Sequence, residues 1–147
     1  MKIERIVVGV DGSDNARTAL RWAADLARAL DAEIVAVHSV GLLERFASGQ
    51  HQQLDTAIAD ARHLFDTDWC VVLDDPAVRS TRLLRDGNPV TVLLGIAQEF
   101  DAGLIVVGSR GLGGYPELLL GSTSTQIAQH SSRPVVIIPS GFAETAA

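Results

Sequence analysis

The residues best suited to chemistry lie in residues 108–125, GSRGLGGYPELLLGSTST, where five of the chain's thirteen glycines are followed by four consecutive hydroxyl side chains. Glycine adopts positive φ without strain and lets a ligand approach the backbone closely. A helix that starts at Gly121 adds amide hydrogens without internal partners and a dipole that favours an anion. The stretch therefore predicts a phosphate-binding loop, in which some hydroxyls of residues 122–125 donate to phosphate oxygens.

A second candidate is the turn Asp11-Gly12-Ser13, which follows the apolar run at residues 6–10. The glycine stretch likewise follows an apolar run, at residues 104–107. Ligands of open parallel sheets bind outside the carboxyl ends of the strands, where the winding reverses direction. If these two strands are neighbours, the turn and the glycine stretch face each other.

Other phosphate and catalytic motifs are absent. The only lysine is Lys2, so the chain has no Walker A lysine, and neither a G-x-G-x-x-G fingerprint nor a G-x-S-x-G elbow occurs. One cysteine, Cys70, and four scattered histidines give no metal-ligand spacing. The competing interpretation of the glycine stretch is structural, with Thr123 and Gln126 forming a capping box and the glycines a close loop.

The pattern around these residues is that of an α/β protein. Short apolar runs predict strands over residues 6–10, 33–40, 78–84, 104–107 and 134–139. Helical periodicity predicts helices over residues 13–30, 50–64, 89–100 and 122–130, and residues 67–73 extend or resume the second helix. Continuous apolar strands that alternate with helices imply a parallel sheet covered on both faces. We expect one domain over residues 1–140 and a loose tail over residues 141–147.

Composition narrows the class of partner. The formal charge of −6 and the pI near 5.0 argue against nucleic-acid and anionic-membrane surfaces. A single cysteine allows no internal disulfide and fits a reducing compartment. No segment approaches the roughly 18 apolar residues of a membrane span. We therefore expect a soluble cytoplasmic protein.

The chain resembles the universal stress protein family over nearly its whole length. Nucleotide-binding members carry G-x2-G-x9-G-[ST], and this sequence has Gly108, Gly111, Gly121 and Ser122 at that spacing. The segments IVVGVDGSDNARTALRWA and DAGLIVVGSRGLGG are equally typical of the family. The resemblance implies an open five-stranded sheet of Rossmann-like, adenine nucleotide alpha hydrolase-like type, with strand order 3-2-1-4-5.

The resemblance also implies an ATP site, with ADP or AMP as related ligands. The triphosphate would lie over residues 111–122, the ribose near Gly108, and the adenine near Ser39. Asp11 would meet a ribose hydroxyl or, through water, a magnesium ion, and no other metal ligand is expected. Arg110 would offset phosphate charge, and Ser124 would be a second hydroxyl ligand, with helix capping or exposure as alternatives. The full set of expected nucleotide contacts is Asp11, Gly12, Ser39, Gly108, Arg110, Gly111, Gly113, Gly114, Gly121, Ser122, Thr123 and Ser124.

Three functions are compatible with these observations. The first is an ATP-binding regulatory protein of stress or energy-state response. The second is a slow magnesium-dependent ATP hydrolase or phosphotransferase, for which Asp11 and His38 are the only candidate bases, so binding is favoured over designed catalysis. The third is a dimeric interaction module without functional nucleotide binding. The resemblance implies a homodimer through the terminal strand Val135–Ile138, and an apolar edge strand invites such pairing.

Overall fold

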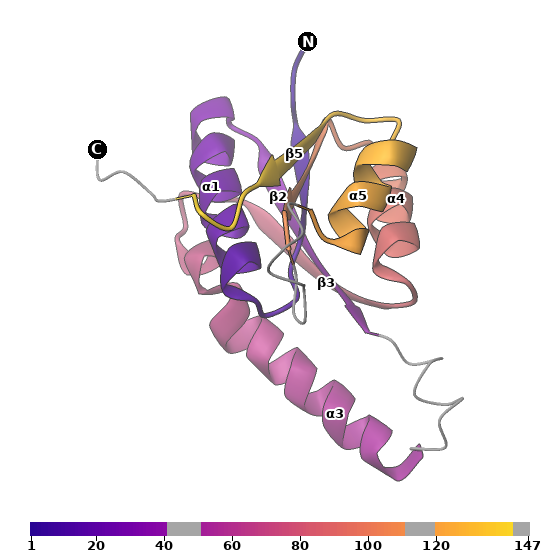
Figure 1. Ribbon diagram of the computed structural model, residues 1–147. Helices are drawn as coiled ribbons and strands as arrows, with labels where there is room; N and C mark the ends of the chain where they lie inside the picture. The colour runs from indigo at the N-terminus through magenta and orange to yellow at the C-terminus, as the bar shows by residue number, and fades with distance from the viewer. Residues whose placement is uncertain (41–50, 111–119, 143–147) are drawn as a thin grey trace.

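The computed structural model describes residues 1–40, 51–110 and 120–142 and contains one five-stranded sheet (Figure 1). Its strands, all parallel, lie in the order β3-β2-β1-β4-β5. The helices lie on both faces, so the fold class and the strand order are confirmed. The strands are β1 (Arg5–Gly9), β2 (Glu33–Val40), β3 (Ser80–Asp86), β4 (Leu104–Gly108) and β5 (Val135–Ile138), and the α-helices are α1 (Asp14–Leu30), α3 (His51–Leu64), α4 (Pro89–Glu99) and α5 (Ser122–His130).

Capping side chains set the starts of two helices. Ser13 caps α1, where its Oγ accepts a hydrogen bond from the Ala16 amide. Asn88 caps α4, with Pro89 at the first helical position. These caps make α1 and α4 begin directly after the turns that follow β1 and β3.

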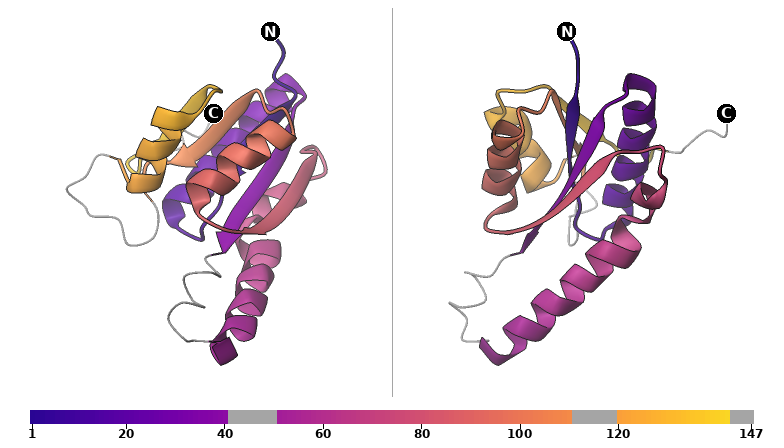
Figure 2. Two further views of the ribbon diagram at one scale, coloured as in Figure 1. Left: turned by 90° about the vertical axis from the view of Figure 1, so that its right-hand side faces the viewer. Right: turned by 180° about the vertical axis from the view of Figure 1, so that it is seen from behind.

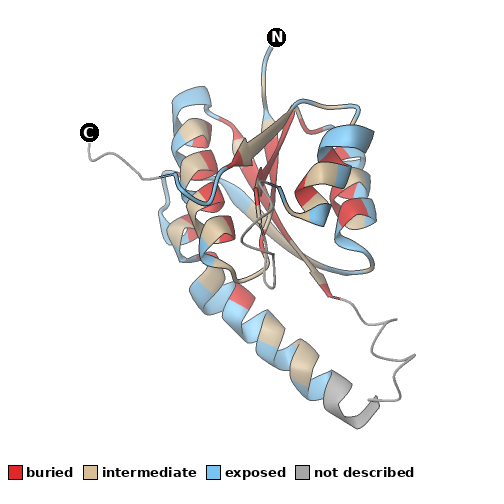
Figure 3. Ribbon diagram, in the orientation of Figure 1, coloured by how far each residue is buried: buried red, intermediate tan, exposed pale blue. Residues whose placement is uncertain are grey.

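The alternation of side chains along the strands produces two cores (Figure 3). One core lies between the sheet and α1 and includes Ile6, Val8 and Ile34. The other lies between the sheet and the pair α4 and α5, and it includes Val7, Val35 and Ile105. Because the central strands are buried on both faces, their carboxyl ends are the positions where polar groups from successive turns meet.

The third strand differs from the prediction. It begins at Ser80, two residues later than expected, and pairs with β2 from Ile34 onward. Val78 is buried in the α1-side core, and its amide donates to the carbonyl of Asp75 in the preceding turn. An apolar residue that packs from a turn gives the same sequence signal as the first residue of a strand.

The segment between α3 and β3 changes helix type twice. A π-helical turn, η1 (Phe65–Trp69), follows α3, and a 3-10 turn, η2 (Val71–Asp74), follows that. The expected continuation of the helix over residues 67–73 is therefore confirmed, although not as regular α-helix. Phe65, Cys70 and Leu73 are buried and anchor this segment on the α1-side core.

Helix α3 extends beyond the carboxyl edge of the sheet, away from the sheet and the helices that cover its two faces (Figures 1 and 2). No side chain among residues 55–64 is buried.

No helix within the described residues is long and apolar enough to cross a membrane. Residues 143–147 of the expected tail lie outside the described residues.

Candidate functional site

Ser109 joins the two ends of the glycine stretch, the residues just after β4 and the start of α5. The carbonyl oxygen of Ser109 accepts hydrogen bonds from the Gly121 amide and, at 2.9 Å, from the Ser124 hydroxyl. The end of β4 and the start of α5 are therefore held side by side. Gly111, Gly113 and Gly114 belong to the intervening segment and lie outside the described residues.

Helix α5 begins without a side-chain cap. Its N-cap is Gly121, in extended backbone conformation, and within the described residues no side-chain cap hydrogen bond is present. The proposed capping box of Thr123 and Gln126 is therefore wrong, because Thr123 already lies inside the helix. First-turn amides without side-chain partners are the groups that bind anions at helix N-termini.

The hydroxyl side chains of α5 divide into two sets. Ser124 is buried, and its Oγ also lies 3.0 Å from the carbonyl oxygen of Gly121. Thr125 Oγ1 donates to that same carbonyl at 2.8 Å. These two hydroxyls bond carbonyl groups within the protein, at Ser109 and Gly121. Because Ser124 is buried, the alternative that it is exposed is wrong. Ser122 is exposed and Thr123 half-buried, which leaves both accessible.

Asn15, in the first turn of α1, joins three segments at the carboxyl edge. Its Oδ1 accepts from the Arg110 amide at 2.8 Å and from Ser109 Oγ at 3.3 Å, while its Nδ2 donates to the carbonyl of Ile138 at 3.0 Å. This approach requires a glycine at position 108, since a Cβ there would lie 2.8 Å from Asn15 Cγ. Sequence reasoning missed Asn15; the available signal was a poor helix former two residues after the cap.

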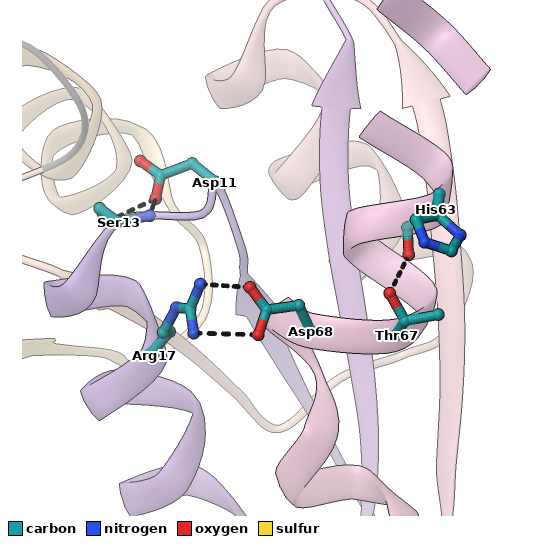
Figure 4. A network of polar contacts seen from close by, with 6 residues as sticks. All are labelled: Asp11, Ser13, Arg17, His63, Thr67 and Asp68. Carbon is teal, nitrogen blue, oxygen red and sulfur yellow. Dashed lines mark hydrogen bonds and ion pairs between the residues drawn. The ribbon is translucent and has the colours of Figure 1, made fainter. Parts of the chain in front are cut away.

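The Asp11 turn lies at the start of the same helix. Asp11 Oδ1 accepts from the amide of Ser13 at 2.9 Å and from its hydroxyl at 2.6 Å (Figure 4). Gly12 has φ +84°, a conformation that glycine adopts without strain. Because Ser13 and Asn15 belong to one helix start, the turn and the base of the glycine stretch are brought together, as the sequence predicts.

Two further predicted residues lie at the ends of their strands. Ser39 donates its hydroxyl to the carbonyl of Gly87, beyond the end of β3. His38 donates from Nδ1 to the carbonyl of Val10 at 2.8 Å, and its ring meets Trp69 edge-on at 4.9 Å between centroids. His38 and Trp69 are therefore packed against each other.

Arg110 contributes a charged side chain to this edge. It is half-buried, and its Nε is buried with no hydrogen-bond partner among the residues that the structure describes. Among the described residues no group of histidine, cysteine, aspartate or glutamate side chains is arranged to hold a metal ion. A guanidinium and uncapped helix amides give this edge the donors that an anionic ligand needs.

A family model described as the universal stress protein family matches residues 2–139. The chain belongs to this family. It is 31% identical to the universal stress protein YxiE of Bacillus subtilis, over 91% of this chain and 97% of that protein. It is 32% identical to a universal stress protein of Mycolicibacterium smegmatis over 90% of this chain, and it spans about half of that relative, 47%.

Solved structures of universal stress proteins share the fold. The UspA protein of Lactobacillus plantarum matches 94% of this chain and 99% of its own with a TM-score of 0.81 at 23% identity. A universal stress protein of Archaeoglobus fulgidus, in complex with dAMP, matches 94% and 99% with a TM-score of 0.70 at 26% identity. A further universal stress protein structure, in complex with cAMP, matches 94% of this chain and 98% of its own with a TM-score of 0.63 at 27% identity.

Proposed function

We propose that this universal stress protein binds an adenine nucleotide, ATP foremost, and acts as a nucleotide-dependent regulatory module. The observation that carries the proposal is the uncapped start of α5, which Ser109 and Asn15 hold beside the Asp11 turn. Universal stress proteins at 26% and 27% identity in complex with dAMP and cAMP support an adenine nucleotide as the ligand class.

Each part of the nucleotide has a proposed place. The phosphates lie against the first-turn amides of α5 and the hydroxyls of Ser122 and Thr123, with the loop glycines 111, 113 and 114 and the Arg110 guanidinium around them. The ribose lies by Gly108 and Asp11, and the adenine by Ser39. Ser124 is left out of this set, because its hydroxyl already donates inside the protein.

We propose that magnesium binds only as the counter-ion of the nucleotide phosphates. Asp11 uses Oδ1 for Ser13, and no hydrogen bond to its Oδ2 is present within the described parts of the chain. A carboxylate oxygen is a suitable acceptor for the water of a hydrated magnesium ion. The ion would supply charge neutralisation to the phosphates, with Asp11 as an outer partner.

Binding accounts for these residues better than a hydrolytic enzyme does. Two residues are candidate bases. His38 uses its Nδ1 in a hydrogen bond to the carbonyl of Val10, and Asp11 uses one of its two carboxylate oxygens to accept from Ser13. Neither has a second titratable side chain hydrogen-bonded to it among the described contacts, so the arrangement of base and orienting group is absent there. Steady phosphate release that is lost in Asp11→Ala would favour the hydrolase instead.

We also propose a homodimer through β5. This strand is the edge of the sheet next to β4, and its side chains Val135, Val136 and Ile137 are only half-buried in the single chain. An unpaired apolar edge strand is a template for pairing with a second copy.

Thermal unfolding with ATP and magnesium tests the nucleotide proposal. A ligand at about 100 times its Kd adds about 2.7 kcal/mol, which for a chain of this size raises the Tm by roughly 5–10 °C. Gly121→Val should abolish the rise, since even a Cβ there would lie 3.3 Å from the Ser109 carbonyl oxygen. Gly141→Val, at a glycine where no atom of the described residues lies within 4 Å of an added Cβ, should keep it. An unchanged wild-type Tm with ATP, ADP and AMP would favour the interaction module.

A further inference from the structure

The η1 turn lies directly on the turn that carries Asp11. A Cβ added to Gly12 would lie 2.7 Å from both Cε2 and Cζ2 of Trp69, so the indole occupies the space that a side chain at position 12 would take. Trp69 is half-buried, and its contact with Gly12 joins two segments that are 57 positions apart in the chain. Nothing in the glycine motif or in the nucleotide proposal uses this residue.

Independent contacts fix the place of the indole. The indole packs against the His38 ring, with the ring centroids 4.9 Å apart and the planes at 73°, and His38 is itself hydrogen-bonded to Val10, just after β1. Next to it, Asp68 pairs with Arg17 of α1, with oxygen–nitrogen distances of 2.7 and 3.4 Å (Figure 4). Phe65 at the start of η1 and Cys70 just after it are buried. The position of Trp69 is therefore set by α1, by β2 and by the core.

The Gly12 peptide needs such support. Glycine has more backbone freedom than any other residue, and Gly12 must hold φ +84° for Asp11 to bond both the amide and the hydroxyl of Ser13. Fixing the backbone of one residue has a cost in conformational entropy. A rigid aromatic ring against Gly12 removes part of that freedom before any ligand arrives, which is how preorganisation raises affinity.

We propose that Trp69 is a positioning residue of the nucleotide site: its indole holds Gly12, and through Gly12 the Asp11 carboxylate, in the conformation that meets the nucleotide. This inference rests on the proposed function. It assigns to the η1 turn a part in ligand binding that Trp69 performs through Asp11 and without a contact of its own to the ligand.

A double-mutant cycle on ATP binding tests it, with Kd measured by calorimetry in magnesium buffer for the wild type, Trp69→Leu, Asp11→Asn and the double variant. Trp69→Leu should weaken binding about tenfold, the equivalent of freeing one backbone residue. The double variant should bind no more weakly than the weaker single variant, because both changes remove the same contact. Additive losses, or an unchanged Kd in Trp69→Leu, would overturn the inference.

Controls separate this role from general packing. Trp69→Phe keeps a flat ring over Gly12 and should retain most of the affinity, whereas equal losses from Phe and Leu contradict the role of the ring. Trp22→Phe changes the other tryptophan, which packs on the α1-side core, and should leave the Kd unchanged. If Trp69→Leu does not unfold cooperatively, the cycle is run with Trp69→Met under the same criteria. A wild type that binds no nucleotide contradicts the proposed function and this inference together, while tight binding with additive losses contradicts the inference alone.

Discussion

At the scale of single residues, Asn15 makes hydrogen bonds to three residues at the carboxyl edge that are all far from it in the sequence. One amide side chain bonds the start of the glycine stretch through Arg110, the end of β4 through Ser109, and the end of β5 through Ile138. These contacts span 94, 95 and 123 positions of sequence. Asn15 therefore determines how the first and last crossovers of the fold meet.

We expect Asn15→Ala to lower the free energy of unfolding by about 1–3 kcal/mol, since it leaves partly buried partners unpaired. It should also weaken ATP binding, because the glycine stretch loses its attachment to α1. Denaturant unfolding and calorimetry measure the two effects. Asn88→Ala is the matched control: it removes the cap of α4 at a cost of about 1 kcal/mol and should leave the Kd for ATP unchanged. Equal effects of both variants on ATP binding would contradict the role of Asn15.

The burial of the Cys70 thiol can be tested by the pH dependence of the unfolding free energy. Desolvation in the core raises the pKa of its thiol from 9.0 to about 12, while the Arg82 guanidinium nearby lowers it to a lesser extent. The folded state therefore favours the neutral thiol, and this stability is complete below pH 9 and is lost as the pH rises from 9 towards 12. The difference in unfolding free energy between the wild type and Cys70→Ala should narrow over that range. A difference that stays constant from pH 8 to 12 would contradict the burial of the thiol.

The sequence predicted those residues of the candidate site that belong to local patterns. Gly108, Gly121 and the α5 hydroxyls were identified because a glycine-rich turn followed by hydroxyl residues at the start of a helix is a pattern that a short stretch of sequence contains. Asn15 and Trp69 were not predicted, because their contacts with this edge join residues that are far apart in the sequence. Ser124 has the right type and place, and only the burial of its hydroxyl distinguishes it from Ser122.

At the scale of elements, the strands and long helices were predictable because each has its own periodicity or cap. The exceptions lie between α3 and β3, where Val78 packs from a turn and η1 departs from α-helical bonding. This segment is held by ion pairs to two other elements, to Arg17 and Arg28 of α1 and to Arg82 of β3. The two pairs with α1 join residues 51 and 47 positions apart, so local propensity could not define the conformation of the segment.

Helix α4 offers a test of element stability. Gly95 lies in its interior, is exposed, and has no atom of the described residues within 4 Å of an added Cβ. Gly95→Ala should therefore raise the free energy of unfolding by about 0.5–1 kcal/mol and the Tm by roughly 2–4 °C. Nucleotide binding should not change, because Gly95 is exposed on α4, which packs on the face of the sheet opposite to α1. A lower Tm would mean that the space around Gly95 is filled.

At the scale of the whole molecule, the edge strand β5 is the proposed dimer interface. Sedimentation velocity should show the wild type as a dimer of 15.6 kDa chains. Val136→Glu should shift it to the monomer, since a carboxylate would lose water on pairing. The opposite edge provides the control: Leu84→Glu, on β3, should leave the dimer intact. A monomeric wild type at all concentrations would contradict the proposed assembly.

The central claim is that the uncapped start of α5 and the Asp11 turn together bind an adenine nucleotide. A crystal structure of the protein grown with saturating ATP and magnesium tests it most directly. We expect the phosphates within hydrogen-bond distance of the Ser122 and Thr123 amides and the ribose beside Asp11. Clear density for this edge with no nucleotide on it, or a nucleotide bound elsewhere on the chain, would contradict the claim.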